Sequence, residues 1–509
     1  MGRVLTNNIS LAYSIESVFG VLNTSGEWKL LEPNDITTFG ATITTVARSP
    51  ISKDRQRKKG TVVDLDSAAE FEHDLTKEVF IDFAEGFVFA RFTGLANSVI
   101  RSGASQQSLA ADDDPPPAGT DSGYTHSALS AAYPTGQLMF ARGFSNATNN
   151  GLKVVKTGST TTSTLITTAL VDETPSLAAN ATLEVAGFRF GTSEISITVT
   201  GTTAVITRIA GTKDFTTLGL TPGQLIHVGG LLVANQFSAG AGYARVVSVP
   251  SATVINLDKL SSTLVTDNGT GDTVDLLYGR FLRNVATDNG SFLERSYQFE
   301  AALPNLGTGG ATRYEYSLGN LANTMAIALP LADKATVTFG FVGTDTQPPT
   351  STRATGASTP TVVRQSTAYN TSADILRLRI QKVDETGLTT CFKDVTLTLN
   401  NNVTPEKCLG TLGAVFMNTG NFEVDLEGQI LFTDEAVASA VRNNETVTMD
   451  TLLKNGDGAI CIDIPSLTLG GGDKEFPVNE SVLMNLTGQA FGDAVLGTSI
   501  GISLFPVVP

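Results

Sequence analysis

The sequence predicts a mainly β fold, in which two tandem β-sandwich or half-barrel domains, each with a flanking helix, are interrupted by a small all-β domain or pair of domains. Three observations lead to this prediction. Gly, Thr, Ala, Val and Asn are abundant and only 17% of the 509 residues are charged, which favours short strands and turns. Apolar and polar residues alternate over several stretches. The pattern F-E-x-D-L occurs at residues 71–75 and again at 422–426, which indicates that one β-rich unit was doubled.

The first unit begins with a long hairpin that a helix follows. Alternating runs at residues 42–46, 61–64 and 70–75 predict its strands, with a polar tip between the first two runs. Thr76 has the residue type and the place of a helix N-cap, and apolar residues recur at four-residue steps over residues 79–88. We therefore expect one helix to lie with its apolar stripe against the sheet.

A linker and an insertion follow this helix. Residues 112–117 are three aspartates and three prolines, which suit a linker outside any sheet. Beyond them the tripeptide Gly-Gln-Leu recurs at residues 136–138 and 223–225, and each copy precedes another glycine at the same spacing. Short β runs with glycine turns predict one or two small barrels or sandwiches, and we place the insertion at residues 119–285.

Strand-like runs resume after the insertion and recur near the end of the chain. The first set corresponds in order to the second: 292–299, 314–329 and 335–342 to 446–453, 459–469 and 482–491. The second set also follows F-E-x-D-L and a second predicted helix, capped near Thr433. Both halves thus share the order hairpin, helix, three strands. The predicted domains are residues 1–118 plus 286–345, the insertion 119–285, and 346–509, with a polar joint at 347–353.

We expect no catalytic, cofactor-binding or metal site. A formal net charge of -16 argues against a protein that grips nucleic acid by neutralising phosphates. The chain has three histidines and neither an H-E-x-x-H nor a G-x-S-x-G motif. The acidic runs at 112–114 and 267–272 are better explained as linker and turn than as calcium loops. Cys391, Cys408 and Cys461 are predicted to be buried free thiols, and neither a signal peptide nor a membrane-spanning run is expected.

These residues resemble the major tail tube proteins of long-tailed bacteriophages with non-contractile tails, the siphoviruses. The resemblance rests on the hairpin run at 49–61 with its basic tip, the F-E-x-D-L strand and its helix, residues 293–297, and closing strands that end at 339–341 and 488–491. It implies rings whose strands close into one barrel around a channel. The rings would stack into the tail, through which DNA leaves the capsid. The resemblance also implies a virion location and assembly in the cytoplasm of the bacterial host.

The resemblance also implies partners and a ring size. A tail tube meets a tape measure protein, a tail terminator and tail tip proteins, and genomic DNA passes through its lumen without specific binding. Family members with a single unit form hexameric rings, so a doubled chain would form an equivalent, pseudo-hexameric ring from three copies. The insertion would project outward as a decoration.

The strongest cationic cluster of this acidic chain lies at the predicted hairpin tip. It comprises Lys53, Arg55, Arg57, Lys58 and Lys59. The cluster is positioned to contact an acidic face of the next ring and so to set stacking. The alternative is a solvated turn that blunts a strand edge. Binding of nucleic acid is a weaker third interpretation, because no aromatic residue is interleaved with the cluster.

Two acidic residues stand at matched places in the repeated motif. Asp74 and Asp425 are candidates to face the lumen, where negative charge repels DNA phosphates and allows DNA to slide. The alternative is that each carboxylate positions the helix that follows, given its proximity to Thr76 or Thr433.

Four functions compete at this point. The leading hypothesis is a structural, non-enzymatic tail tube subunit, and the closest alternative is a minor tail or baseplate protein with the same fold. A β-rich surface adhesin is expected to carry a signal peptide. A tailspike depolymerase is expected to show regular rung-length repeats, and the doubled unit differs from that pattern.

Overall fold

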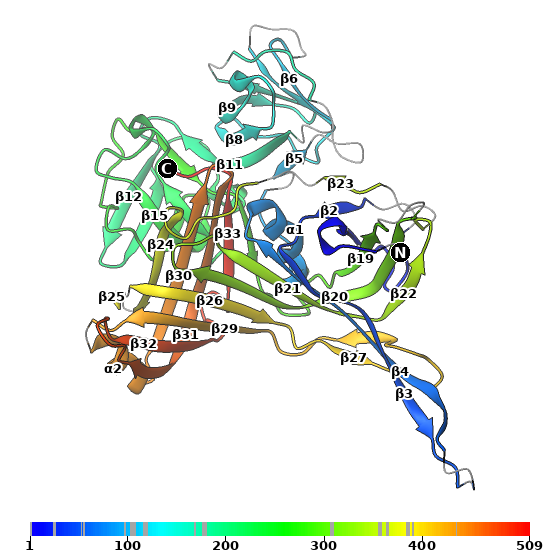
Figure 1. The fold of residues 1–509 in the computed structure, drawn as a ribbon. Helices are drawn as coiled ribbons and strands as arrows, with labels where there is room; N and C mark the ends of the chain where they lie inside the picture. The colour runs from blue at the N-terminus through cyan, green and yellow to red at the C-terminus, as the bar shows by residue number, and fades with distance from the viewer. Residues whose placement is uncertain are drawn as a thin grey trace.

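The structure is a computed structural model in which two α-helices accompany many antiparallel strands within the described residues, and the predicted mainly β fold is confirmed. It describes residues 3–23, 27–51, 53, 56–95, 98–101, 108–115, 121–166, 169–175, 181–305, 310–354, 359–362, 366–382, 387–388, 391–433 and 435–509. Figure 1 shows a central body, a long two-stranded projection on one side and an insertion on the other.

Strands of both halves of the chain form one continuous antiparallel sheet, which we call the shared sheet. Its strands follow one another in the order β3 (Asp35–Arg48), β4 (Lys58–Asp74), β21 (Thr336–Gly343), β20 (Arg313–Pro330), β26 (Phe392–Asn400), β29 (Glu423–Leu431), β32 (Leu483–Ala490) and β31 (Gly458–Glu475). The first half of the chain meets the second where β20 pairs with β26. The sheet therefore crosses between the halves without a break.

The long strands β20 and β31 also belong to a second layer. The N-terminal part of β20 pairs with β19 (Ser296–Leu303), which pairs in turn with β1 (Ser10–Ile15), and with β22 (Asp345–Thr350). The N-terminal part of β31 pairs in the same way with β30 (Thr446–Asn455), which pairs with β24 (Ile375–Lys382), and with β33 (Gly501–Phe505). The predicted joint at 347–353 thus begins inside β22, where an edge strand tolerates prolines.

Short elements complete the body. They are η1 (Thr6–Asn8), β2 (Lys29–Leu31), β18 (Arg280–Arg283), β23 (Thr361–Val362), β25 (Gly387–Leu388) and the hairpin of β27 (Thr404–Glu406) and β28 (Phe416–Asn418). Strand β18 pairs with β33, which ties the end of the insertion to the last strand of the chain.

Two helices pack on the same core between these layers. Helix α1 (Lys77–Val88) begins after Thr76, whose side chain accepts a hydrogen bond from the Val79 amide at 3.4 Å, so the predicted N-cap is confirmed. The rings of Phe83 and Phe87 contact aromatic rings of β21, with Phe83 centred 4.8 Å from Phe339. Helix α2 (Ala436–Arg442) buries Val437 and Ala440 in this core.

The second helix is capped differently from the prediction. Its N-cap residue is Glu435, which makes no side-chain capping hydrogen bond, so the capping expected from Thr433 was wrong. This helix is also shorter than α1. Its place depends on packing of its apolar face rather than on a local cap.

The two halves use equivalent strand pairings, but the repeated motif does not mark equivalent positions. A register shift interrupts β19–β20 at Tyr297 and interrupts β30–β31 at the corresponding Val447. When these two bulges are aligned, the strand pairings relate β4 of the first half to β29 of the second half. In this alignment Phe71 corresponds to Gly428. Phe422 therefore does not occupy the place of Phe71. The order hairpin, helix, strands recurs, while the F-E-x-D-L match is out of register with it.

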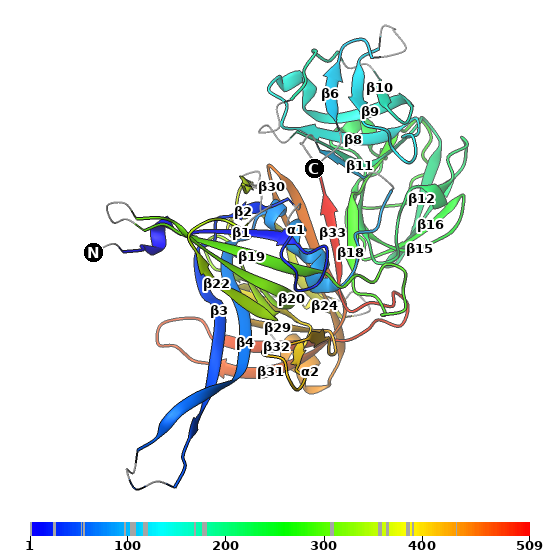
Figure 2. The same cartoon turned by 90° about the vertical axis from the view of Figure 1, so that its right-hand side faces the viewer.

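Strands β3 and β4 extend beyond the sheet as a two-stranded projection, which we call the arm (residues 43–63). Its described side chains are exposed, including the apolar Ile43, Val46, Val62 and Val63. The arm points away from the insertion in both views (Figure 1 and Figure 2). The predicted long hairpin with a polar tip is present.

The insertion has its own hydrophobic core, which extends from Ile100 to Tyr278. Figure 1 shows two lobes, one around β6–β10 and one around β12–β16. Its strands are β5 (Val99–Arg101), β6 (Leu109–Asp112), β7 (Gly123–His126), β8 (Gln137–Arg142), β9 (Gly151–Gly158), β10 (Thr162–Leu165), β11 (Thr182–Phe190), β12 (Ile195–Thr200), β13 (Thr203–Arg208), β14 (Leu225–Val228), β15 (Gly242–Ser251), β16 (Val254–Asp258) and β17 (Val274–Leu277). The helical turns η2 (Ala147–Asn149), η4 (Phe215–Thr217) and η5 (Val233–Asn235) connect them.

The packing of the insertion differs from the expected bounds of 119–285 at both ends. Strands β5 and β6 precede residue 119, yet β5 pairs with β11 and β6 pairs with β7. Strand β18 precedes residue 285, yet it pairs with β33 of the body. The repeated Gly-Gln-Leu does mark similar places, since Gln137 donates to the Gly187 carbonyl and Gln224 to the Gly279 carbonyl.

Close packing of α1 leads to a first prediction. A Cβ on Gly86 would overlap the buried ring of Tyr297, which the rings of Phe83 and Phe341 surround. We expect Gly86→Ala to lower the free energy of unfolding by about 1–3 kcal/mol, because overpacking outweighs the better helix propensity of Ala. Urea denaturation measures this change. The control is Gly456→Ala, where a Cβ meets no atom within 4 Å; a stabilised Gly86→Ala protein would contradict the packing.

Candidate functional site: the acidic face and the arm

One face of the shared sheet carries acidic side chains in a regular pattern. Along β4, every second residue from Leu65 to Phe71 is buried towards the helices, and the residues between them lie on the opposite face. The acids of that opposite face on β4 are Asp64, Asp66, Glu70, Glu72 and Asp74. We call this surface the acidic face.

Strand β29 continues the acidic face in the second half of the chain. Val424 and Leu426 are buried, whereas Glu423, Asp425 and Glu427 alternate with them on the other side. The register partners of these acids on β26 are uncharged, for example Thr398 opposite Asp425. Carboxylates and hydroxyl or amide groups thus line this side of the sheet.

The structure brings Asp74 and Asp425 to the same face, although not to matched positions. Asp74 is the last residue of β4 and pairs with Thr336, while Asp425 lies inside β29 and pairs with Gln489. Because β4 and β29 align with Phe71 against Gly428, the residue in the place of Asp425 is Ala68. The matched-motif argument for these two residues was therefore wrong, although both carboxylates belong to the acidic face.

The two carboxylates have opposite electrostatic surroundings. Partial burial favours a higher pKa for Asp74, but hydrogen bonds from Lys334 at 2.7 Å and from Asn34 at 2.5 Å outweigh it and lower the pKa. Partial burial raises the pKa of Asp425, and the neighbouring charges of Glu423 and Glu427 raise it further. Asp425 is thus held among like charges, whereas Asp74 is neutralised by a cation.

The basic cluster lies at the end of the arm. Lys53, Arg57, Lys58 and Lys59 are exposed there, while Arg55 lies outside the described residues. At the base of the arm the charge is opposite: Lys407, from the segment after β27, binds Asp64 at 2.5 Å and Asp66 at 2.6 Å. The hydrogen bond from Lys407 lowers the pKa of Asp64. The chain therefore presents cations at one end of the arm and carboxylates on the sheet behind it.

Buried ion pairs join the insertion to the body, and sequence reasoning missed them. Lys77 of α1 lies 3.3 Å from Glu184 of β11 and also donates to the Asp457 carbonyl at 3.2 Å. Burial alone would raise the pKa of Glu184, but the charges of Lys77 and neighbouring arginines outweigh it and lower the pKa to about 2. Arg245 of β15 binds Asp463 of β31 at 2.9 Å. These pairs join residues too distant in sequence for a local pattern to reveal.

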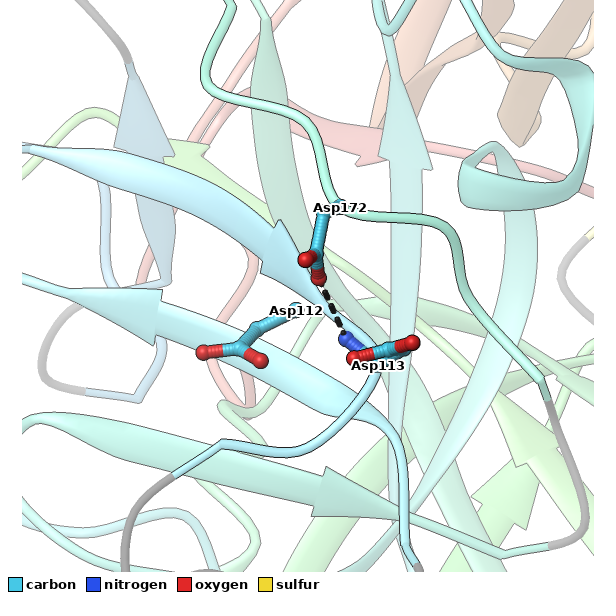
Figure 3. Close-up of side chains that lie close together, drawn as sticks. All are labelled: Asp112, Asp113 and Asp172. Atoms are coloured by element: carbon cyan, nitrogen blue, oxygen red, sulfur yellow. Dashed lines mark hydrogen bonds between the residues drawn. The ribbon is translucent and has the colours of Figure 1, made fainter.

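Three carboxylates gather in the insertion (Figure 3). Asp112, Asp113 and Asp172 form, among the described residues, a cluster of potential metal ligands. Hydrogen bonds from backbone amides account for two of them: Asp172 accepts from the Asp113 amide at 3.0 Å, and Asp112 accepts from the Asp114 amide at 2.9 Å. Nothing else in the cluster indicates an ion.

The cysteines differ in part from the prediction. Cys461 is a buried free thiol, and burial raises its pKa. Cys391 and Cys408 are exposed, so the prediction that they are buried was wrong. Cys391 directly precedes β26 and Cys408 follows β27, and the core covers neither side chain.

Comparison with known proteins gives one family match. Residues 260–482 match the family model described as phage tail tube protein. The match begins near the end of the insertion and continues through β20, β26 and β29 into β31, so it includes the strands at which the two halves meet. It covers less than half of the chain. It supports a structural tail tube protein that assembles from several subunits in the virion tail.

No curated protein matches the chain. Among the described residues, no helix is long and apolar enough to cross a membrane.

The surroundings of the two acids lead to a second prediction, with opposite signs. The raised pKa of Asp425 means that its charge reduces stability at neutral pH, and that protonation relieves this as the pH falls towards the unfolded value near 4. The lowered pKa of Asp74 means that its charge adds stability above about pH 4, which is lost as the pH falls further.

We therefore expect Asp425→Asn to raise the free energy of unfolding at pH 7 and Asp74→Asn to lower it, each by less than about 1 kcal/mol because solvent screens both groups. Urea titrations of the unassembled chain at pH 7 and pH 3.5 measure both effects. The two variants serve as controls for each other. Equal shifts of the same sign would contradict the assigned surroundings.

Proposed function

We propose that this chain is the ring-forming subunit of a siphovirus-type tail tube, the conduit through which DNA leaves the capsid. The single observation that carries the proposal is that the shared sheet, as far as the residues are described, ends in two open strands. Within the described residues, β3 pairs only with β4, and the C-terminal part of β31 pairs only with β32. Exposed strand edges favour pairing with another chain, and ring closure removes them. The family match supports this proposal.

The repeated pairings support a duplicated tube domain and a ring of three chains. Each half contributes a hairpin, a helix and strands in the same order, and even the bulges at Tyr297 and Val447 correspond. Three chains would supply six such units. We propose tube domains at residues 3–95 plus 280–350 and at 359–509, with a decoration domain that has its own core inserted into the first of them.

The acidic face is our candidate for the wall of the lumen. Both helices pack on the other side of the shared sheet, where the core lies. A ring with its helices outside would turn Glu70, Asp425 and their neighbours inward. Such a wall repels phosphates and holds DNA at no specific site.

A minor tail or baseplate protein of the same fold remains the second candidate. The exposed apolar side chains of the arm favour the major tube protein over it, since a chain that stacks on identical rings covers such residues repeatedly. The number of copies per virion separates these functions, with many rings for a tube and one for a minor protein. The tape measure, terminator and tail tip proteins are the proposed partners. The surface adhesin and the tailspike depolymerase are the remaining alternatives.

A third prediction tests the function directly. We expect the purified protein to form rings of three chains and then long hollow tubes, because each exposed edge and each arm finds a partner in another copy. Mass photometry measures the ring and negative-stain microscopy shows the tubes. Monomers that polymerise in no salt condition would contradict the proposal.

A fourth prediction concerns the arm. We expect the double change Arg57→Glu with Lys59→Glu to leave folded rings but to abolish tubes, because reversed charge at the tip repels an acidic neighbouring ring. Microscopy distinguishes rings from tubes. Lys156→Glu on the insertion is a control with the same change of sign. Tubes of normal length from the double variant would leave the basic tip as a solvated turn.

A further inference from the structure

We propose that the outer edge of β3 pairs with the C-terminal end of β31 in a second copy of this chain, in the register that β20 and β26 already use within one chain. This inference rests on the proposed ring and specifies its contact residue by residue. We call the β20–β26 pairing the internal seam and the proposed contact the external seam.

The internal seam shows how two tube units join. It is antiparallel and includes the pairs Ala328 with Thr396, Leu329 with Val395, and Pro330 with Asp394. Leu329 and Val395 are 7% and 2% exposed and belong to the common core. The contact therefore combines backbone hydrogen bonds with continuity of the core.

Equivalent strand pairings extend this geometry to the open edges. When the bulges in β19–β20 and β30–β31 are aligned, Ala322 of β20 corresponds to Leu469 of β31. Their pairing partners, Phe341 of β21 and Gly488 of β32, therefore correspond as well. Further along these strands, Ala328 pairs with Thr336 and Glu475 pairs with Leu483. Thr336 and Leu483 occupy corresponding places in β21 and β32, so Ala328 corresponds to Glu475. The end of β31 therefore takes the place of the end of β20.

The same alignment identifies the edge of β3 that takes the place of β26. Glu70 of β4 corresponds to Glu427 of β29, so their partners Thr38 and Thr396 correspond. In the same way Glu72 corresponds to Gln429, so their partners Asp35 and Asp394 correspond. The β3–β4 pairing shifts register between Ile36 and Thr38, so Thr37 is an additional residue there, whereas the β26–β29 pairing shifts between Phe392 and Asp394. The edge of β3 from Asp35 to Thr42 thus corresponds to the edge of β26 that forms the internal seam.

The residues at the two open edges agree with this register. In the internal seam Asp394 lies opposite Pro330, and the corresponding external residues are again Asp35 and Pro477. Next to them, Val395 and Leu329 correspond to Ile36 and Phe476. An apolar pair beside an Asp and a Pro therefore occurs at both places.

Exposure of the apolar pair indicates that something covers it. Phe476 is 74% exposed, whereas its internal counterpart Leu329 is 7% exposed. Ile36 is only half-buried at the margin of the core. The external seam would place these two side chains against each other and extend the core from one chain to the next. A second copy fits both edges at once, because every chain carries both of them.

Disulfide trapping tests the register. In a background of Cys391→Ser and Cys408→Ser, the pair Thr38→Cys with Glu475→Cys is introduced. Directly opposite residues of an antiparallel pair have Cα atoms about 4.5–5.5 Å apart, within the range of a disulfide. After mild oxidation we expect the monomer band on a non-reducing gel to be converted to linked dimers and trimers, and a reductant to restore it.

Two controls accompany this variant. Ala328→Cys with Thr396→Cys places the same pair in the internal seam, and we expect it to form a disulfide within one chain that leaves a monomer band. Thr42→Cys with Glu475→Cys moves one cysteine four residues along β3, roughly 13 Å, and we expect little linkage between chains.

The outcomes separate this inference from the proposed function. Rings that form in the background protein without a link through Thr38→Cys and Glu475→Cys would overturn the external seam and leave the ring intact. Equal or better linkage through Thr42→Cys would overturn the register. A background protein that stays monomeric would overturn both proposals together.

Discussion

Backbone pairing between β20 and β26 is the interaction on which the rest of the structure depends. These strands come from different halves of the chain and form one antiparallel ladder. Because of it, side chains of the first half such as Phe71 and of the second half such as Leu467 share one core. Each half alone would expose a long strand edge, which favours association with other strands. The two halves thus have equivalent strand pairings, and their side chains pack in one common core.

The two longest strands connect this sheet to the layer above it. Each contributes its N-terminal part to one layer and its C-terminal part to the other, and the bulges at Tyr297 and Val447 lie where the layers separate. A bulge bends a strand and increases its twist, which allows one strand to serve two sheets. The aromatic side chains of α1 fill the space between the layers.

The insertion is attached to this body by buried charge. Removing one member of a buried ion pair leaves an uncompensated charge and costs about 3–5 kcal/mol. Lys77 with Glu184, and Arg245 with Asp463, therefore set the position of the insertion strictly.

Sequence reasoning predicted most strands and the first helix, because alternation and the cap at Thr76 are local signals. The register of the strands could not be predicted from the sequence, since the partner strands that determine the register lie far away in the chain. In strands that alternate acids with apolar residues, F-E-x-D-L recurs out of phase, so Phe422 was matched wrongly to Phe71. Short strands such as β5 and β33 carry little periodic signal.

The candidate site was predicted in part for the same reason. The basic tip is a continuous run, so its residues were evident from the sequence. Asp74 and Asp425 were singled out, yet strand alternation adds Glu70 and Glu72 to the same face. The buried pair of Lys77 and Glu184 has no sequence signature, because its members meet only after the insertion has folded.

The pairing of β18 with β33 has a consequence for the order of events during synthesis. Phe281 lies opposite Ser503, so the strand that leaves the insertion finds its partner more than two hundred residues further along the chain. Contacts so far apart in sequence form late, after local elements have folded. The insertion and the arm can both be folded before the body that carries them is closed. Before β18 and β33 pair, the folded insertion and arm are attached to a body whose sheet is incomplete.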